Sequence, residues 1–331
     1  MKRRILMRTL AAASLAAAFA APAHAQAKDK VVLLLNWYVY SEHAPFFIGK
    51  EKGFYDAEGI DLEIQEGRGS GVSVQAVAAG SATFGYVDVP TMIRAATKGA
   101  PVKAIGVALQ VSPMAVMGLA EKNIKAPKDI VGKIVAMTPG DSMSQIWPLF
   151  MKKTGLQEGQ YKVVSGDGQT KLNAVINGQA DLLLGYVMDQ NMKIQDALHK
   201  PVQVIRFADY GVNLISSGIV ANKDTLASKG DLVKRFMRAS TKAFEEAEKS
   251  PEAAVDSMLK ANAKAGQRET LLIGLKLTTP LYRTEETKSQ RPFRVSMKNV
   301  NESLDLLVQY GGLDPALRGK PEDWVTNEYL P

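Results

Sequence analysis

The clearest feature of the chain is a continuous apolar run, Val31–Leu35, that ends abruptly in polar and aromatic side chains. A strand that is apolar at every position has both faces buried, as in a parallel sheet covered by helices. Asn36, Trp37 and Tyr38 follow at its carboxyl end, the edge at which open α/β sheets bind ligands. The pattern therefore predicts a buried strand that delivers an amide and two aromatic rings to a ligand-binding loop.

Apolar stretches of strand length alternate with stretches of helix length up to about residue 220. The expected strands are Ile60–Ile64, Ala82–Val87, Val102–Leu109, Met114–Leu119, Ile134–Met137, Tyr161–Val164, Leu182–Tyr186, Val202–Phe207 and Asn213–Val220. From Asp224 onwards only amphipathic helices remain. Strands that alternate with helices in this way predict an α/β fold with mainly parallel sheets.

Two segments of the chain resemble each other. Ala76–Ala82 and Ala174–Ala180 each follow a glycine-rich turn and lead through a strand to Gly-Tyr-Val. This internal similarity favours two lobes of one kind, although the same unit also recurs in single α/β domains. We place lobe 1 at residues 26–112 and 216–331, with the C-terminal helices wrapping it, and lobe 2 at residues 113–215. The lobes are expected to be joined by a hinge.

The first 25 residues have the pattern of an export signal. Four basic residues within positions 2–8 precede an Ala-rich apolar stretch, and Ala23-His24-Ala25 fits a cleavage site. The apolar stretch is shorter than the about 20 residues that span a membrane. We therefore expect cleavage after Ala25 and a soluble protein in the periplasm.

Composition narrows the function. Without the signal, 37 of the 41 basic residues remain against 34 acidic ones, and no basic cluster with interleaved aromatic residues argues for nucleic acid. The chain has no cysteine and only three histidines, which argues against a zinc site or a thiol nucleophile. It also lacks a nucleophile elbow and a phosphate loop. We expect no metal, no cofactor and no enzymatic activity.

A family resemblance rests on Asn36, Trp37, His43 and the segment Lys50–Tyr55, which occur in a characteristic order and spacing. The chain resembles the NMT1/THI5-like periplasmic substrate-binding proteins of the SsuA and ThiY type. The resemblance implies a type II periplasmic-binding-protein fold that closes on a small molecule and delivers it, as a monomer, to an ABC permease with its ATPase. It implies a flat heterocycle such as a thiamine pyrimidine precursor, with a sulfonate or other small organic anion as the alternative.

The same resemblance extends to pyrimidine synthases of the THI5 type. Their cysteine-rich motif is absent, and no lysine lies between Asn36 and His43 to hold pyridoxal phosphate. These differences favour a binding protein, and a synthase remains the other alternative.

Residues at the end of the first strand suit a flat ligand. Trp37 and Tyr38 can stack on a ring, and the Asn36 amide can both donate and accept hydrogen bonds at a ring edge. His43 lies at the start of the next helix. The resemblance gives it a ligand contact, whereas a lone histidine often serves the local structure instead.

A glycine-rich turn precedes a helix in each lobe. In lobe 1, Ser70 and Gly71, assisted by Arg68, can present helix N–H groups to a polar or anionic group, and a simple tight turn is the alternative. The corresponding residues of lobe 2 are Thr138, Gly140, Asp141 and Ser142. The Asp141 carboxylate there favours hydroxyl or amine donors over an anion.

Each Gly-Tyr-Val strand is followed by an aspartate. Tyr86 and Asp88 belong to the first strand and Tyr186 and Asp189 to the second. Each aspartate fits a helix N-cap without any ligand. Alternatively, both lobes point a phenol and a carboxylate into the cleft.

Overall fold

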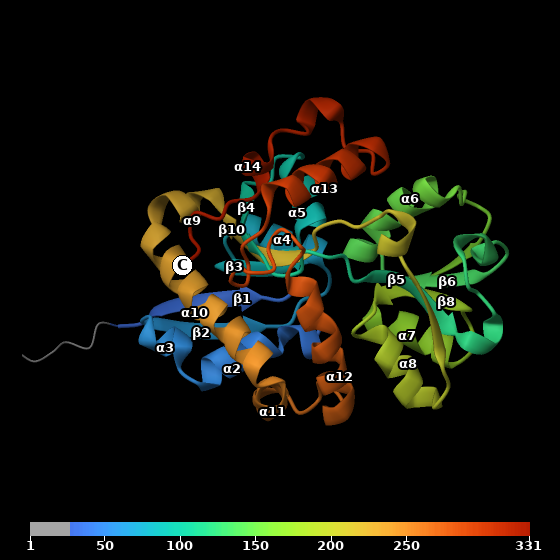
Figure 1. Ribbon diagram of the computed structural model, residues 1–331, viewed down its shortest axis with the longest axis horizontal. Helices are drawn as coiled ribbons and strands as arrows, with labels where there is room; N and C mark the ends of the chain where they lie inside the picture. Colours follow the sequence, from blue (N-terminus) through green and yellow to red (C-terminus); the bar gives the residue numbers. More distant parts are fainter. Residues whose placement is uncertain (1–26) are drawn as a thin grey trace, which may run out of the picture.

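The computed structural model describes residues 27–331 (Figure 1). The predicted export signal and its cleavage site lie outside these residues. Two α/β lobes, each built on a five-stranded sheet, lie side by side. Within residues 27–331, no helix combines the length and the apolar character needed to cross a bilayer.

The sheet of lobe 1 has the strand order β2-β1-β3-β10-β4. Its strands are β1 (Asp29–Leu34), β2 (Ile60–Gln65), β3 (Phe84–Asp88), β4 (Val102–Val107) and β10 (Ser217–Asn222). β1 pairs in parallel with β2 on one side and β3 on the other. Because β1 lies in the sheet interior, Val31, Leu33 and Leu35 are buried in the core.

The sheet of lobe 2 has the strand order β7-β6-β8-β5-β9. Its strands are β5 (Met114–Leu119), β6 (Ile134–Met137), β7 (Lys162–Ser165), β8 (Leu182–Tyr186) and β9 (Val202–Arg206). β6 pairs in parallel with β7 and β8, so it takes the place that β1 has in lobe 1.

Both sheets are mainly parallel, as expected, but each contains one strand that runs in the opposite direction and makes the sheet mixed. β10 runs antiparallel to β3 and β4, and β5 runs antiparallel to β8 and β9. The chain passes to lobe 2 between β4 and β5 and returns between β9 and β10, and each arriving strand enters its sheet in the opposite direction. The sequence does not reveal this, because a strand buried on both faces is apolar in either direction.

Helices connect the strands of each lobe. In lobe 1 these are α2 (Ala44–Glu51), preceded by a 3₁₀ turn η2 (Ser41–His43), then α3 (Phe54–Ala57), α4 (Ser70–Ala78) and α5 (Val89–Ala96). In lobe 2 they are α6 (Ser142–Thr154), α7 (Gly168–Ile176) and α8 (Gln190–Leu198).

The C-terminal helices wrap lobe 1, as expected. They are α9 (Lys223–Ser228), α10 (Gly230–Lys249), α11 (Pro251–Ala261), α12 (Arg268–Thr278), α13 (Met297–Gln309) and α14 (Pro321–Trp324). α10 and α11 pack against α2 (Figure 1). Phe236 of α10 stacks on Phe84 of β3 with ring centroids 4.2 Å apart, so this helix completes the core of lobe 1.

The two lobes contact each other at both ends of the cleft between them. On one side, α12 and η2 meet lobe 2, where Ser41 Oγ donates to the Met188 carbonyl at 3.2 Å. On the other side, Lys152 Nζ of α6 donates to the Gln309 carbonyl of α13 at 2.9 Å. The structure therefore has the lobes closed on each other.

Candidate ligand-binding cleft

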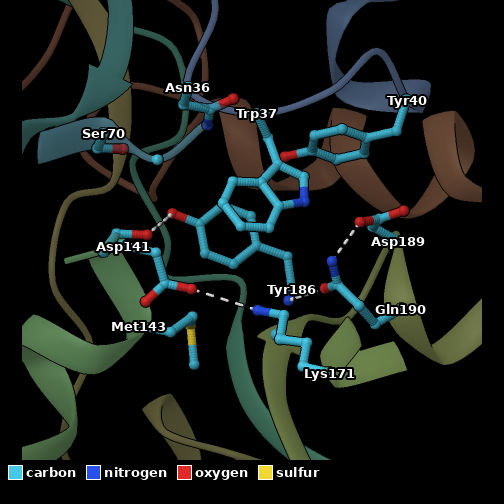
Figure 2. A pocket seen from close by; sticks show the side chains of 13 residues that line it. Asn36, Trp37, Tyr40, Ser70, Asp141, Met143, Lys171, Tyr186, Asp189 and Gln190 are labelled. Atoms are coloured by element: carbon cyan, nitrogen blue, oxygen red, sulfur yellow. Dashed lines mark hydrogen bonds and ion pairs between the residues drawn. The ribbon is translucent and has the colours of Figure 1, made fainter. Parts of the chain in front are cut away.

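A cavity lies between the two lobes (Figure 2). Its walls are formed by Asn36, Trp37, Tyr40, Gly69 and Ser70 of lobe 1 and by Asp141, Ser142, Met143, Lys171, Gly185, Tyr186, Asp189 and Gln190 of lobe 2. Most of these residues follow the carboxyl ends of β1, β2, β6 and β8. Strand ends from both sheets therefore surround the cavity, which is the usual ligand site of open α/β sheets.

Glycines hold the loop after β1 against the loop after β2. The amides of Gly67 and Gly69 donate to the carbonyls of Trp37 at 3.0 Å and Asn36 at 2.9 Å. A Cβ atom on Gly67 would lie 1.9 Å from the Leu35 oxygen, so only glycine permits this approach. The glycine-rich turn thus supports the loop that carries Asn36 and Trp37.

Trp37 reaches across the cleft from lobe 1 to lobe 2. A Cβ atom on Gly168, the first residue of α7, would lie 2.5 Å from Trp37 Cζ2. The ammonium group of Lys171 lies 5.1 Å from the centre of the Trp37 ring, within the range of a cation–π contact. Trp37 therefore lines the cavity and also joins the two lobes.

His43 lies behind the wall and contacts Asn36. The His43 ring is completely buried, and its Nε2 lies 2.8 Å from Asn36 Oδ1. Burial lowers the pKa of His43 to about 3, and the charge of Lys193 acts in the same direction. The imidazole is therefore neutral at physiological pH.

Glu42 is completely buried behind the lobe 1 wall. Its carboxylate accepts hydrogen bonds from the hydroxyls of Tyr40 and Tyr86, the latter at 2.8 Å. Burial raises the pKa of Glu42, although the hydrogen bonds that it accepts act in the other direction. This role was not predictable from the sequence, because an acidic residue in the first turn of a helix is usually explained by the helix dipole.

The lobe 2 wall contains a buried ion pair. Lys171 is only 2% exposed, and its Nζ lies 3.2 Å from Asp141 Oδ2. The other carboxylate oxygen of Asp141 caps α6 by accepting the Ser144 amide at 2.7 Å. Lys171 was missed from the sequence because a lysine on a helix normally points to solvent.

Asp189 connects the two lobes. Its Oδ2 accepts a hydrogen bond from the Tyr38 hydroxyl of lobe 1 at 2.7 Å, and also one from Gln190. Its Oδ1 lies 3.1 Å from Lys193 Nζ. The Asp189 side chain makes no capping hydrogen bond to α8, so the simple N-cap interpretation fails at this position.

Asp88 has a different role from Asp189, although their sequence positions correspond. It caps α5 by accepting the Thr91 amide at 2.9 Å and the Thr91 hydroxyl at 2.7 Å. Burial raises the pKa of Asp88 to about 6 against the effect of these hydrogen bonds. Its amide donates to Ser70 Oγ at 3.0 Å, which places Asp88 directly behind a residue of the wall.

The predicted site residues fall into two groups. Asn36, Trp37, Ser70, Asp141, Ser142, Tyr186 and Asp189 line the cavity. Tyr38, His43, Gly71, Tyr86, Asp88, Thr138 and Gly140 lie outside its wall, several of them directly behind residues that line it. A contact between any of these residues and a ligand stays a prediction.

Several wall residues were not predicted. They are Tyr40, Gly69, Met143, Lys171, Gly185 and Gln190. All except Lys171 lie within three residues of a predicted position, at the same strand ends. Lys171 comes from the body of α7, where the pattern carries no such signal.

The model of the family described as NMT1/THI5 like matches residues 40–254, which is more than half of the chain. The chain belongs to the NMT1/THI5-like family. A protein of Legionella pneumophila named 4-amino-5-hydroxymethyl-2-methylpyrimidine phosphate synthase is 26% identical over 86% of each chain. A formylaminopyrimidine-binding protein of Halalkalibacterium halodurans is 24% identical over 71% of each chain.

Solved structures confirm the fold of this NMT1/THI5-like chain. The alkanesulfonate-binding protein SsuA of Xanthomonas axonopodis pv. citri, bound to MOPS, superposes with a TM-score of 0.68. The match covers 91% of this chain and 99% of SsuA at 13% sequence identity. The expected periplasmic-binding-protein fold with two α/β lobes is therefore confirmed.

The expectation of no enzymatic activity is contradicted by the sequence relatives. The synthase of Legionella pneumophila matches 86% of this chain, and a protein of the same name from Aspergillus parasiticus matches 91% of it. Because proteins named as synthases match most of the chain, the missing cysteine motif does not by itself exclude an enzyme. No lysine lies between Asn36 and His43, but the cavity still contains a lysine, because Lys171 lines it.

Lys171 alone does not make the cavity fit pyridoxal phosphate. Its ammonium group is paired with Asp141. No second cationic side chain among the described residues lines the wall to balance a phosphate group.

Proposed function

We propose that this chain is the periplasmic substrate-binding component of an ABC importer and captures a small flat heterocycle, such as a pyrimidine precursor of thiamine. The ligand binds to lobe 1 in the open form and gains contacts with lobe 2 as the cleft closes. Because these contacts exist only in the closed form, ligand shifts the population towards it, and the permease recognises that form.

The proposal rests on one observation: the cavity wall presents an aromatic ring, and each of its carboxylates already forms an ion pair with a lysine. Trp37 offers a ring for stacking. The two carboxylates of the wall have lysine partners, Asp141 with Lys171 at 3.2 Å and Asp189 with Lys193 at 3.1 Å. A neutral flat ligand fits such a wall because it leaves no buried charge without a partner.

A sulfonate or another small anion is served less well by the same wall. Arg68, the cation expected to assist it, is exposed and does not line the cavity. Lys171 can balance an anion only by weakening its ion pair with Asp141. The likeness to SsuA is at 13% identity and supports the fold without supporting its ligand.

The test is a thermal-shift series on residues 26–331 with 4-amino-5-hydroxymethyl-2-methylpyrimidine, riboflavin and ethanesulfonate. Ligand at a hundredfold excess over its Kd raises stability by about 2.7 kcal/mol. We expect a shift with the pyrimidine that Trp37→Ala removes and Trp324→Ala preserves, since Trp324 lies in α14, outside the cavity wall. A shift with ethanesulfonate alone that Trp37→Ala leaves intact would overturn the proposal.

A second candidate function is the synthesis of 4-amino-5-hydroxymethyl-2-methylpyrimidine phosphate. This activity is favoured by the name of the Legionella pneumophila relative, whose alignment covers 86% of each chain. Mass spectrometry would detect this product after incubation of the protein with pyridoxal phosphate, which the synthase resemblance implies, and a donor of the two further nitrogen atoms that the product contains. Product formation that Asn36→Ala abolishes would assign the cavity to catalysis in place of transport.

A further inference from the structure

Asn36 is a buried amide whose oxygen already has a partner. The residue is 4% exposed, and its Oδ1 lies 2.8 Å from His43 Nε2. Within residues 27–331 its Nδ2 makes no hydrogen bond, and the residue lines the cavity. Figure 2 shows the amide nitrogen on the cavity side and the oxygen turned away from it.

The hydrogen bonds of His43 decide which way round this amide lies. The Tyr40 backbone N–H points at His43 Nδ1 at a distance of 3.4 Å, so Nδ1 is the acceptor of the ring. In a neutral imidazole the proton then resides on Nε2, which must donate. Within residues 27–331 its only hydrogen-bond partner is the Asn36 side chain, so the amide oxygen must face His43 and the NH₂ group must face the cavity.

The surroundings of His43 keep the ring neutral. Tyr40 and Tyr86 pack edge-on against it, with ring centroids 4.5 and 5.8 Å away. The neighbouring carboxylate, Glu42, is engaged by the hydroxyls of these two tyrosines and does not hydrogen-bond to the ring. The positive charge of Lys193 further disfavours protonation. The donor at Nε2 therefore stays fixed over the physiological pH range.

We propose that His43 is a positioning residue that locks the Asn36 amide with its NH₂ group towards the cavity, so that Asn36 selects ligands presenting a hydrogen-bond acceptor at this edge. The choice of a heterocycle as the ligand rests on the proposed function. The orientation of the amide does not, because it follows from contacts within lobe 1.

The opposite side of Trp37 presents an acceptor. The Tyr40 hydroxyl donates its proton to Glu42, which leaves the phenolic oxygen as an acceptor in the cavity wall. Asn36 and Tyr40 lie on opposite sides of Trp37 in Figure 2. A planar ring with an acceptor nitrogen on one edge and an amino group on another matches both, and an aminopyrimidine has this arrangement.

The binding test compares two ligands by calorimetry. One is 4-amino-5-hydroxymethyl-2-methylpyrimidine, and the other is its benzene counterpart, in which both ring nitrogens are CH. We expect wild type to prefer the pyrimidine by about tenfold or more, because the benzene leaves the buried Asn36 donor unpaired. Asn36→Ala should abolish the preference. An unchanged preference in Asn36→Ala would overturn the proposal.

The positioning role of His43 is tested in the same assay. His43→Phe frees the amide to rotate and should lower the preference several-fold, whereas His43→Gln keeps a donor near Nε2 and should retain it. In the Asn36→Ala background, His43→Phe should have no further effect on the preference. Equal losses in His43→Phe and His43→Gln, or an effect of His43→Phe that persists without Asn36, would show a merely structural role.

A ligand-free measurement separates this inference from the proposed function. The ¹⁵N spectrum of the His43 ring should show a proton on Nε2 and none on Nδ1 between about pH 8 and pH 5. Exposed His199 provides the reference signal. A proton on Nδ1 would overturn the inference even if pyrimidines bind. If the protein binds ethanesulfonate and no pyrimidine, the proposed function fails, and a loss of ethanesulfonate affinity in Asn36→Ala would still support the donor orientation.

Discussion

The two walls of the cavity differ in charge, because one is lined by neutral groups and the other by charged groups. The lobe 1 wall consists of neutral groups, Asn36, Trp37, Tyr40 and Ser70, held from behind by buried His43 and Glu42. The lobe 2 wall contains Asp141, Lys171 and Asp189. Its two carboxylates form ion pairs, Asp141 with Lys171 and Asp189 with Lys193.

This difference suggests a division of labour between the lobes. Neutral groups with fixed donors and acceptors distinguish one ligand from another, because an unmatched buried polar group is costly. Ion pairs that are satisfied within lobe 2 add no charge for the ligand to neutralise. Lobe 1 would then determine which ligand binds, while lobe 2 closes over it.

The largest effect is expected from breaking the buried ion pair of lobe 2. Lys171→Met leaves the Asp141 carboxylate buried without its cation and should lower the free energy of unfolding by about 3 to 5 kcal/mol. Urea denaturation measures this loss. The matched double variant Lys171→Met/Asp141→Asn removes both charges and should recover most of it. Equal losses in the single and double variants would contradict an ion pair that is balanced within lobe 2.

The pH dependence of the free energy of unfolding tests the buried Asp88 carboxyl behind the lobe 1 wall. Burial raises the pKa of Asp88 from 3.8 in model compounds to about 6, so the folded state holds a proton that the unfolded state has lost. This contribution is complete below about pH 4 and is lost as the pH rises through 6. The fall should be smaller by about 2 to 3 kcal/mol in Asp88→Asn. An identical pH profile in Asp88→Asn and wild type would contradict the assignment.

Closure can be impaired from lobe 2 without touching the ligand. In Gly168→Ala the new methyl group would collide with Trp37 across the cleft. Overpacking of this kind costs about 1 to 3 kcal/mol, so calorimetry should show pyrimidine binding weakened by about tenfold. Gly230→Ala has no atom closer than 3.9 Å to the new carbon and should bind like wild type. Unchanged affinity in Gly168→Ala would show that Trp37 does not meet α7 in the bound form.

The smallest expected effect comes from a single hydrogen bond between the lobes. Tyr38→Phe removes the hydroxyl that donates to Asp189 at 2.7 Å and should weaken ligand binding by about 1 kcal/mol, or about fivefold. The stability of the ligand-free protein should change less than its affinity, because the bond forms only on closure. Tyr329→Phe, on the far side of lobe 1, is the matched control.

Strand ends were predictable from the sequence, and groups behind the wall were not. The apolar run Val31–Leu35 located β1, and three residues of the loop after it, Asn36, Trp37 and Tyr40, line the cavity. The roles of Asp88 and Asp189 could not be told apart, because both precede helices and only the fold shows that Tyr38 reaches Asp189. Burial of Glu42 and Lys171 was equally hidden, since local patterns predict that charged helix residues face solvent.

The most direct test of the division between the lobes is a crystal structure of residues 26–331 with 4-amino-5-hydroxymethyl-2-methylpyrimidine. Our account predicts the ring stacked on Trp37, with a ring nitrogen at hydrogen-bond distance from Asn36 Nδ2 and the Asp141–Lys171 ion pair intact. A ligand held by a separated Lys171, or one that receives no hydrogen bond from Asn36, would contradict it.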